Sequence, residues 1–157
     1  MNNAAKGFAG LSAAAVLAIT LIIKPFEGRE DSYVDPVGVW TSCYGHTGEG
    51  VVPGREYSDA ECEALLRLDT LEREAQLLRY VRVPISDEIR ASLISFVYNV
   101  GVGNFRSSTL LKKLNAGDYV GACNELTRWT YAGGERLAGL VRRREAERQL
   151  CLRGARP

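Results

Sequence analysis

Residues 58–101 read SDAECEALLRLDTLEREAQLLRYVRVPISDEIRASLISFVYNVG. Ser58 and Glu61 have the spacing of a capping box, in which the two side chains satisfy free backbone N–H groups where a helix begins. Apolar residues then recur every three or four positions, as on the buried face of a helix. Pro84 ends this predicted helix, Ser86 is expected to cap a second one, and Gly101 is expected to end it. The stretch therefore predicts two long amphipathic helices.

The segments on either side complete the predicted architecture. Shorter helices, separated by glycine-containing turns, are expected at about 108–114, 118–129 and 137–150. Residues 25–56 are instead rich in Gly, Val, Tyr, Thr and Pro, and Tyr33–Tyr44 alternates β-prone pieces with turn residues. We therefore predict an α+β fold, with a small β-rich lobe at 25–56 and a larger, mainly helical lobe at 57–157.

The bulk composition is that of an ordinary globular protein. The chain has 157 residues, which suits one compact domain. Its net charge is +1. Because this charge is close to zero, it gives no electrostatic reason to expect a nucleic-acid partner.

The N-terminus contains an uncharged stretch, residues 7–23, between Lys6 and Lys24. Its length is at the lower limit for crossing a bilayer, and glycine and alanine dilute its Leu and Ile residues. Three interpretations compete: a cleaved signal peptide, a permanent anchor and a buried core helix. No small-residue cleavage site follows Lys24, and a permanent anchor is normally richer in large apolar residues. We predict that residues 1–24 form an export signal that is not cleaved and that the membrane holds weakly.

The four cysteines are Cys43, Cys62, Cys123 and Cys151. An exported chain reaches an oxidising compartment, which favours two disulfides over four buried thiols. Three pairings are possible, and our hypothesis pairs Cys43 with Cys62 and Cys123 with Cys151. No C-x-x-C pair occurs and His46 is the single histidine, so we expect no metal site and no other cofactor.

The β-rich stretch contains two carboxylic acids that could act as a pair. Hydrolysis of a glycosidic bond needs a protonated acid at the leaving oxygen and a carboxylate on the other face of the sugar. Glu27 precedes Asp35 in this stretch, and the hydroxyl of Thr41 could position a water. Two acids at such a spacing are also common as solvated surface residues, so the pair alone is a weak signal.

Three motifs resemble those of the phage-type lysozymes, glycoside hydrolase family 24. They are Phe26-Glu27-Gly28 with Tyr33-Val34-Asp35, Thr41 and Gly45-His46-Thr47-Gly48; Ser95-Phe96-Val97-Tyr98-Asn99-Val100-Gly101 with Gly103-Asn104-Phe105; and Arg128-Trp129-Thr130-Tyr131-Ala132-Gly133-Gly134 with Gly139-Leu140 and Arg142-Arg143. The resemblance extends over nearly the whole chain and implies a lysozyme-like fold. One departure is that seven residues separate Glu27 from Asp35, where the family usually has eight; the missing residue falls between Gly28 and Ser32.

The resemblance implies a role for several of these residues. Glu27 would be the general acid, Asp35 would stabilise the positive sugar and orient a water, and Thr41 would help to hold that water. The residues expected to contact the substrate are Thr47, Tyr98 and Ser108. The implied reaction is hydrolysis, by a monomer, of the β-1,4 bond between N-acetylmuramic acid and N-acetylglucosamine in the glycan strands of peptidoglycan.

The weak apolar N-terminus resembles the signal-anchor-release segment of endolysins in this family. It implies that residues 7–23 hold the chain in the host inner membrane, with the domain in the periplasm. The enzyme would be inactive until this segment leaves the bilayer and refolds against the domain. Alternatives are a catalytically dead peptidoglycan-binding module, a lytic transglycosylase, or a small membrane protein that makes lesions.

Other polar and aromatic residues have simpler interpretations. His46 is expected to be a structural turn residue with a hydrogen-bonded ring, and Trp40 and Trp129 are expected in the core. The charged residues from Arg142 to Arg148 have the spacing of a solvated, salt-bridged helix face.

Overall fold

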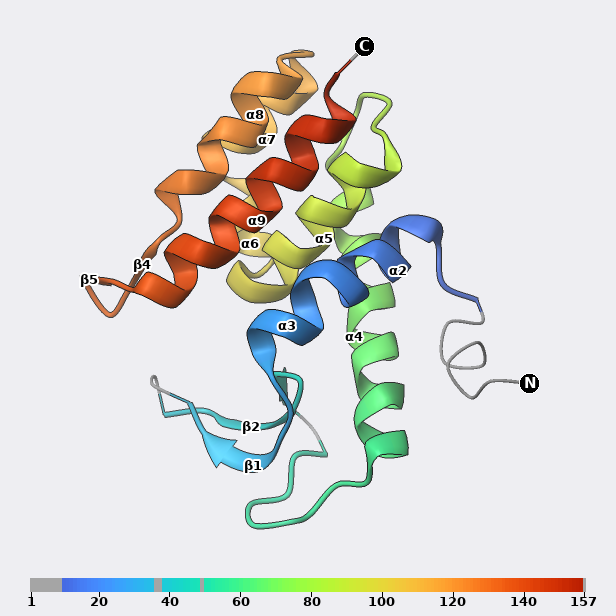
Figure 1. The fold of residues 1–157 in the computed structure, drawn as a ribbon, viewed down its shortest axis with the longest axis vertical. Coiled ribbons are helices and arrows are strands. Elements are labelled where there is room, and N and C mark those ends of the chain that lie inside the picture. The colour runs from blue at the N-terminus through green and yellow to red at the C-terminus, as the bar shows by residue number, and fades with distance from the viewer. Residues whose placement is uncertain (1–9, 36–37, 49, 157) are drawn as a thin grey trace.

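The computed structural model describes residues 10–35, 38–48 and 50–156, and it has two lobes joined by a long helix (Figure 1). The helices, in chain order, are α2 (Ala13–Ala18), the π-helix η1 (Ile19–Ile23), α3 (Lys24–Glu27), α4 (Asp59–Leu78), α5 (Asp87–Val100), α6 (Val102–Arg106), α7 (Thr109–Asn115), α8 (Tyr119–Glu125), the 3₁₀ helix η2 (Leu126–Arg128) and α9 (Ala138–Gly154). The strands are β1 (Glu30–Val34), β2 (Trp40–Cys43), β3 (His46–Thr47), β4 (Tyr131–Ala132) and β5 (Glu135–Arg136). The α+β class predicted from the sequence is confirmed.

The small lobe is built on an antiparallel sheet in the order β1-β2-β3. Tyr33 pairs with Thr41, and Thr41 pairs with Thr47, so these three side chains share one face of the sheet. Trp40 is the neighbour of Thr41 on β2, and it points to the other face, where it is 42% exposed. The expectation that Trp40 lies in the core is therefore wrong, because alternation along the strand gives the buried face to Thr41.

The two long helices begin where their caps predict. The Ser58 hydroxyl accepts from the Glu61 backbone N–H, and the Glu61 carboxylate accepts from the Ser58 backbone N–H, which completes the capping box of α4. The Ser86 side chain caps α5 by accepting from the Ile89 backbone N–H, and Gly101 ends α5 with a φ of 85° that favours glycine. Figure 1 shows α4 running from the small lobe to the helical lobe. It thus connects the sheet to the main core.

Much of the N-terminal apolar stretch lies inside the helical lobe. In α2 and η1, six residues are at most 2% exposed: Ala14, Ala15, Ala18, Ile19, Ile22 and Ile23. They pack into the same core as α5. The Ser12 hydroxyl caps α2 and donates to Glu74 on α4 at 2.7 Å, which fixes the start of the segment. In this conformation residues 13–23 are therefore part of the helical lobe, whereas residues 1–9 of the predicted export signal lie outside the described residues.

No helix within 10–35, 38–48 and 50–156 is both long and apolar enough to cross a membrane.

The C-terminal helices differ from the sequence expectation in their details. The helix expected at about 118–129 is divided into α8 and η2, and α6 and the β4–β5 hairpin were not anticipated. Trp129 packs edge-on against Phe96 with ring centroids 5.4 Å apart, so it lies half-buried against the edge of the core in which it was expected. Cys123 on α8 is bonded to Cys151 on α9. This disulfide ties together two helices that are distant in the chain.

Candidate active site

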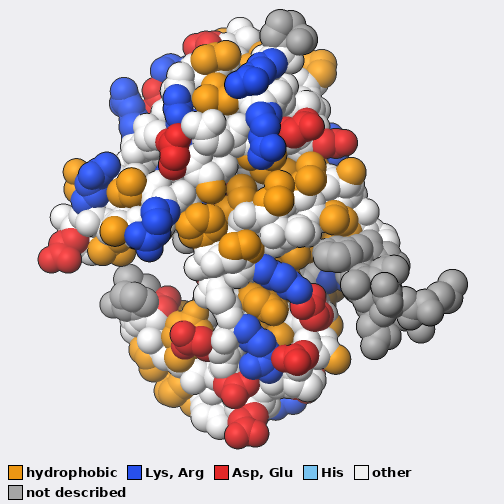
Figure 2. Space-filling view, in the orientation of Figure 1, with side chains coloured by type: hydrophobic (Ala, Val, Ile, Leu, Met, Phe, Trp, Pro, Cys, Tyr) orange, Lys and Arg blue, Asp and Glu red, His pale blue; other side chains and the backbone are white. Residues whose placement is uncertain are grey.

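A cavity of about 480 Å³ lies between the two lobes. Figure 2 shows the surface hollowed between them. The residues that line the cavity are Glu27, Tyr33, Asp35, Thr41, Gly45, Thr47, Asp69, Arg73, Tyr98, Asn99, Val100 and Gly101. The structure thus brings together Glu27, Asp35, Thr41, Thr47 and Tyr98, which the sequence analysis proposed for catalysis or substrate contact.

Ser108 does not line this cavity. Its side chain is buried, accepts from the Leu111 backbone N–H at 3.0 Å and donates to the Phe105 carbonyl at 2.7 Å. The structure therefore gives Ser108 a different role from the expected substrate contact, since its hydroxyl is used as the N-cap of α7.

Glu27 is the last residue of α3, and two neighbours fix its carboxylate. The Nη1 atom of Arg143 on α9 lies 2.5 Å from Glu27 Oε1. On the other side is Gly45, whose φ is +78°; a Cβ there would lie 2.8 Å from Glu27 Oε2. A side chain at Gly45 would thus displace the carboxylate. The turn before His46 therefore has to contain a glycine for steric as well as backbone reasons.

Arg143 belongs to a buried charge cluster on α9. Its Nε lies 3.4 Å from Glu147 Oε1, and the Nε of Arg144 lies 2.9 Å from Glu147 Oε2. The side chains of Arg144 and Glu147 are completely buried. Ser95 on α5 donates to Glu147 at 2.7 Å, and Arg144 donates to Asn99 at 2.8 Å.

This cluster corrects the expectation of a solvated helix face for Arg143, Arg144 and Glu147, whereas the paired Glu145 and Arg148 do face solvent as expected. Burial raises the pKa of Glu147, against the opposing effect of the two guanidinium groups. Burial also lowers the pKa of Arg144 to about 10. These three side chains are buried against α5, and the cluster includes Arg143, the residue that pairs with Glu27.

The second carboxylate, Asp35, lies at the end of β1. Its Oδ1 accepts from the Val39 backbone N–H at 2.8 Å, across the tip of the β1–β2 hairpin. Thr41 is buried in the sheet face beside it and donates to the Val39 carbonyl at 3.1 Å. The hairpin thus presents a carboxylate and a hydroxyl to one wall of the cavity.

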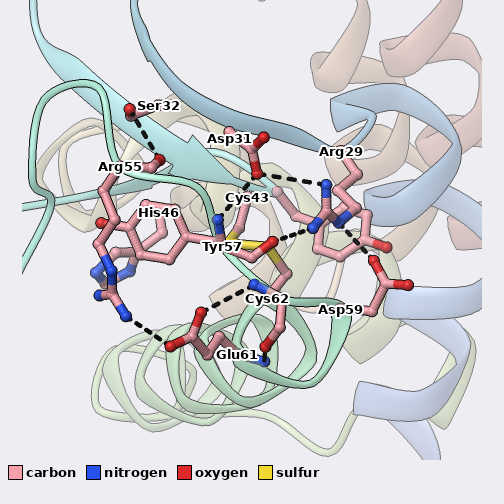
Figure 3. Close-up of a disulfide and its surroundings, with 12 residues drawn as sticks. Arg29, Asp31, Ser32, Cys43, His46, Arg55, Tyr57, Asp59, Glu61 and Cys62 are labelled. Carbon is pink, nitrogen blue, oxygen red and sulfur yellow. Dashed lines mark hydrogen bonds and ion pairs between the residues drawn. A yellow bond between two sulfur atoms is a disulfide. The ribbon is translucent and has the colours of Figure 1, made fainter.

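The segment that connects Glu27 to Asp35 is attached to the N-terminal end of α4. The β1–β2 register is irregular between Glu30 and Ser32, within the segment where the family spacing is one residue longer. Figure 3 shows Arg29 directed at Asp59 and at the Tyr57 carbonyl, while Asp31 accepts from the Tyr57 backbone N–H. These contacts attach the segment to the start of α4.

The disulfide between Cys43 and Cys62 lies in the same region. It joins β2 to α4, so both disulfide pairs of the sequence hypothesis are present in the structure. The pair holds the sheet on the helix at the point where the segment after Glu27 is also attached. The relative position of the cavity walls is therefore fixed by covalent and polar contacts together.

Some polar residues that line the cavity were not proposed by the sequence analysis, among them Asp69 and Arg73 on α4 and Asn99 on α5. Asp69 on α4 lies 2.7 Å from Nδ1 of His46, which confirms that the histidine ring is hydrogen-bonded, and burial raises the pKa of Asp69. Asn99 on α5 accepts from Arg144. Tyr98 itself donates to the Tyr44 carbonyl at 2.5 Å, and burial raises its pKa. The expectation that the His46 ring is hydrogen-bonded was the one sequence signal that could have indicated a nearby acid such as Asp69.

The negative charges of the two candidate acids also act on Tyr33. Its pKa is raised by burial and then by the negative charges of Glu27, Glu30 and Asp35. The cavity therefore contains the carboxylate of Glu27 at the end of α3, paired with Arg143, and the carboxylate of Asp35 on the β1–β2 hairpin with the Thr41 hydroxyl beside it. This set can protonate a leaving oxygen and direct a water or stabilise a positive centre.

Comparison with known proteins gives consistent matches. The family model described as phage lysozyme matches residues 24–147. A SAR-endolysin of Bacteriophage PS119 is 51% identical over 93% of this chain and 92% of its own length. A SAR-endolysin of Enterobacteria phage P21 is 53% identical over 78% of this chain and 74% of its own length. The solved structure of the active form of P1 phage endolysin Lyz is similar with a TM-score of 0.80 and 29% identity, covering 96% of this chain and 89% of that chain.

Proposed function

The chain belongs to the phage lysozyme family and is a lysozyme-type hydrolase, and we propose that it cleaves the β-1,4 bond between N-acetylmuramic acid and N-acetylglucosamine in peptidoglycan. The observation that carries this proposal is that Glu27, Asp35 and Thr41 line one cavity. No residue of this set needs a metal or cofactor for the chemistry proposed. The SAR-endolysin names of the relatives support the same class of activity.

The proposed roles follow from the position of each group. Glu27, held by Arg143, protonates the oxygen that leaves with the next sugar. Asp35 stabilises the positive charge that develops on the sugar ring, and with Thr41 it orients the water that attacks. Tyr98 and Thr47 contact the sugar from the cavity wall.

The test compares purified wild-type protein with Glu27→Gln on isolated peptidoglycan in detergent-free buffer. Glu30→Gln is the matched control, because Glu30 is exposed three residues away and does not line the cavity. We expect Glu27→Gln to lose about 10²- to 10⁴-fold of the rate of reducing-sugar release, and Glu30→Gln to lose little. Equal activity of Glu27→Gln and wild type would exclude Glu27 as the acid.

The products distinguish hydrolysis from its rivals. Hydrolysis adds water and leaves reducing ends, whereas a lytic transglycosylase leaves anhydro sugar ends that mass spectrometry separates. A protein that binds peptidoglycan but releases no product in either form would be a binding module without catalytic activity.

We also propose that the N-terminal segment controls this activity by occupying one of two places. In the host inner membrane, residues 7–23 would hold the domain on the periplasmic side; after release, residues 13–23 pack into the core as described above. Because η1 leads directly into α3, the segment that fills the core also places Glu27. Withdrawal of the segment into a bilayer would therefore remove the helix that positions Glu27. The enzyme would act in the periplasm after release.

A pair of substitutions can separate membrane release from folding. Ala13 and Thr20 are exposed in the folded protein, so Ala13→Leu with Thr20→Leu leaves the core unchanged. On the insertion scale each leucine stabilises the membrane form by roughly 0.5 kcal/mol. We expect slower release from membranes after depolarisation, measured by fractionation, with normal specific activity of the soluble protein. The control is Ala13→Ser with Thr20→Ser. Release at the wild-type rate by the leucine variant would contradict the proposal.

A further inference from the structure

The turn between β2 and β3 packs against the carboxylate of Glu27. The turn consists of Tyr44 and Gly45. Because a Cβ at Gly45 would lie 2.8 Å from Glu27 Oε2, the backbone of the turn is next to the proposed acid with no side chain between them. A shift of this backbone would therefore change the space that the carboxylate occupies.

The backbone of this turn has an uncommon conformation. Within residues 10–35, 38–48 and 50–156, Cys43 is the only residue other than glycine with a positive φ, at 57°, and Gly45 follows with a φ of 78°. A residue with a side chain keeps such a conformation only where its surroundings fix it. The contacts of the turn with the rest of the molecule therefore decide where its backbone lies.

These contacts come from two helices. The disulfide of Cys43 and the hydrogen-bonded ring of His46 attach the two flanks of the turn to α4. The disulfide is drawn in Figure 3. The middle of the turn is held from α5, where the Tyr98 hydroxyl donates to the Tyr44 carbonyl at 2.5 Å. This bond acts on the peptide group that leads directly into Gly45.

The ring and the hydroxyl of Tyr98 have separate environments. Tyr98 lines the cavity, where its ring can contact a sugar. A tyrosine hydroxyl has a single proton to donate, and this one is donated to the small lobe. Burial raises the pKa of Tyr98, so the hydroxyl keeps this proton in neutral and mildly alkaline solution.

We propose that the Tyr98 hydroxyl is a positioning group for the general acid, because it holds the Tyr44–Gly45 peptide in the place that keeps the Glu27 carboxylate against Arg143. The inference rests on the proposed function, since it assumes that Glu27 is the acid. It gives Tyr98 a second role beside its expected contact with the sugar. The hydroxyl acts on catalysis through the turn, and the ring acts through the substrate.

The first test is Tyr98→Phe, which keeps the ring and removes the hydroxyl, assayed on soluble glycan strands of peptidoglycan. We expect kcat to fall about three- to tenfold, as for the loss of one hydrogen bond, and KM to change by less than about twofold. The matched control is Tyr119→Phe, because the Tyr119 hydroxyl also donates to a backbone carbonyl, that of Pro84 at 2.7 Å, but does not line the cavity. The control should keep wild-type kinetics. Circular dichroism and the thermal midpoint verify folding.

A double-mutant cycle with Gly45→Ala tests the route through the turn. Gly45→Ala displaces the carboxylate directly, so removing the Tyr98 hydroxyl as well should add less than about twofold to its loss of kcat. Losses that multiply in the double variant would show that the two groups act independently, and would overturn the inference.

Other outcomes separate this inference from its rivals. A higher KM with unchanged kcat for Tyr98→Phe would assign the hydroxyl to the sugar, and would overturn the positioning role. Wild-type kinetics of Tyr98→Phe or of Gly45→Ala would overturn it too. Failure of the wild-type protein to cleave the glycan would instead refute the proposed function, and this inference with it.

Discussion

The buried charge cluster of α9 makes a sharp prediction about stability. Glu147 is the counter-ion of both Arg143 and Arg144, and the Glu147 and Arg144 side chains are completely buried. Glu147→Gln keeps the shape and the acceptor for Ser95 but removes the negative charge. Arg144 then loses its counter-ion and keeps only neutral acceptors, the side-chain oxygens of Asn99 and of the new glutamine, while its charge stays in the interior.

The magnitude follows from the cost of an uncompensated buried charge. Breaking a buried pair by removing one partner costs about 3–5 kcal/mol, a large part of a total stability of roughly 5–15 kcal/mol. With an m-value of about 2 kcal/mol per molar urea, the unfolding midpoint should fall by about 1.5–2.5 M. Urea denaturation followed by circular dichroism, with the disulfides intact, measures this shift.

A neighbouring acid on the same helix provides the control. Glu145 is paired with Arg148 at 2.9 Å, but its side chain is 48% exposed. Glu145→Gln should therefore change the free energy of unfolding by less than about 1 kcal/mol. An unchanged midpoint for Glu147→Gln would refute the reasoning, since it would mean that the raised pKa leaves Glu147 neutral in the folded protein.

Three further predictions concern the site and its support. Gly45→Ala should reduce peptidoglycan cleavage at least about tenfold, whereas Gly48→Ala should not; both glycines have positive φ, but only a Cβ at Gly45 would meet the carboxylate of Glu27, the proposed acid. Cys123→Ala with Cys151→Ala should cost about 3.5 kcal/mol by loop entropy for a separation of 28 residues, seen as a lower urea midpoint, and a shift below about 1 kcal/mol would contradict this account. Burial raises the pKa of Asp69, so the folded state keeps the proton of this acid to a higher pH than the unfolded state does. The contribution of Asp69 to the free energy of unfolding therefore declines as pH rises from about 4 through the folded pKa. Urea titrations at several pH values should show the free energy of unfolding of wild type, relative to Asp69→Asn, falling as pH rises. A relative free energy that rises with pH would contradict this prediction.

The elements predicted well are those whose signals are local. Ser58 and Glu61 satisfy backbone groups within their own helix turn, and Gly101 ends α5 because few other residues adopt its φ. The α8 boundary was less well predicted, since the change to a 3₁₀ turn at Leu126 brings no comparable cap. Trp40 was misplaced because composition does not reveal which face of a strand is covered.

The sequence by itself determined the fold class, the main helix boundaries and the identity of the acids to consider, because capping, helical periodicity and motif spacing act between residues close in the chain. Only the tertiary structure decided that Glu27 meets Arg143, 116 positions away, and that Arg144 and Glu147 are buried. It also decided that the turn containing Gly45 packs against the same carboxylate. The physical reason is that burial and electrostatic partnership depend on which elements cover a side chain, and charged residues at helical spacing have the same pattern in water as in a core.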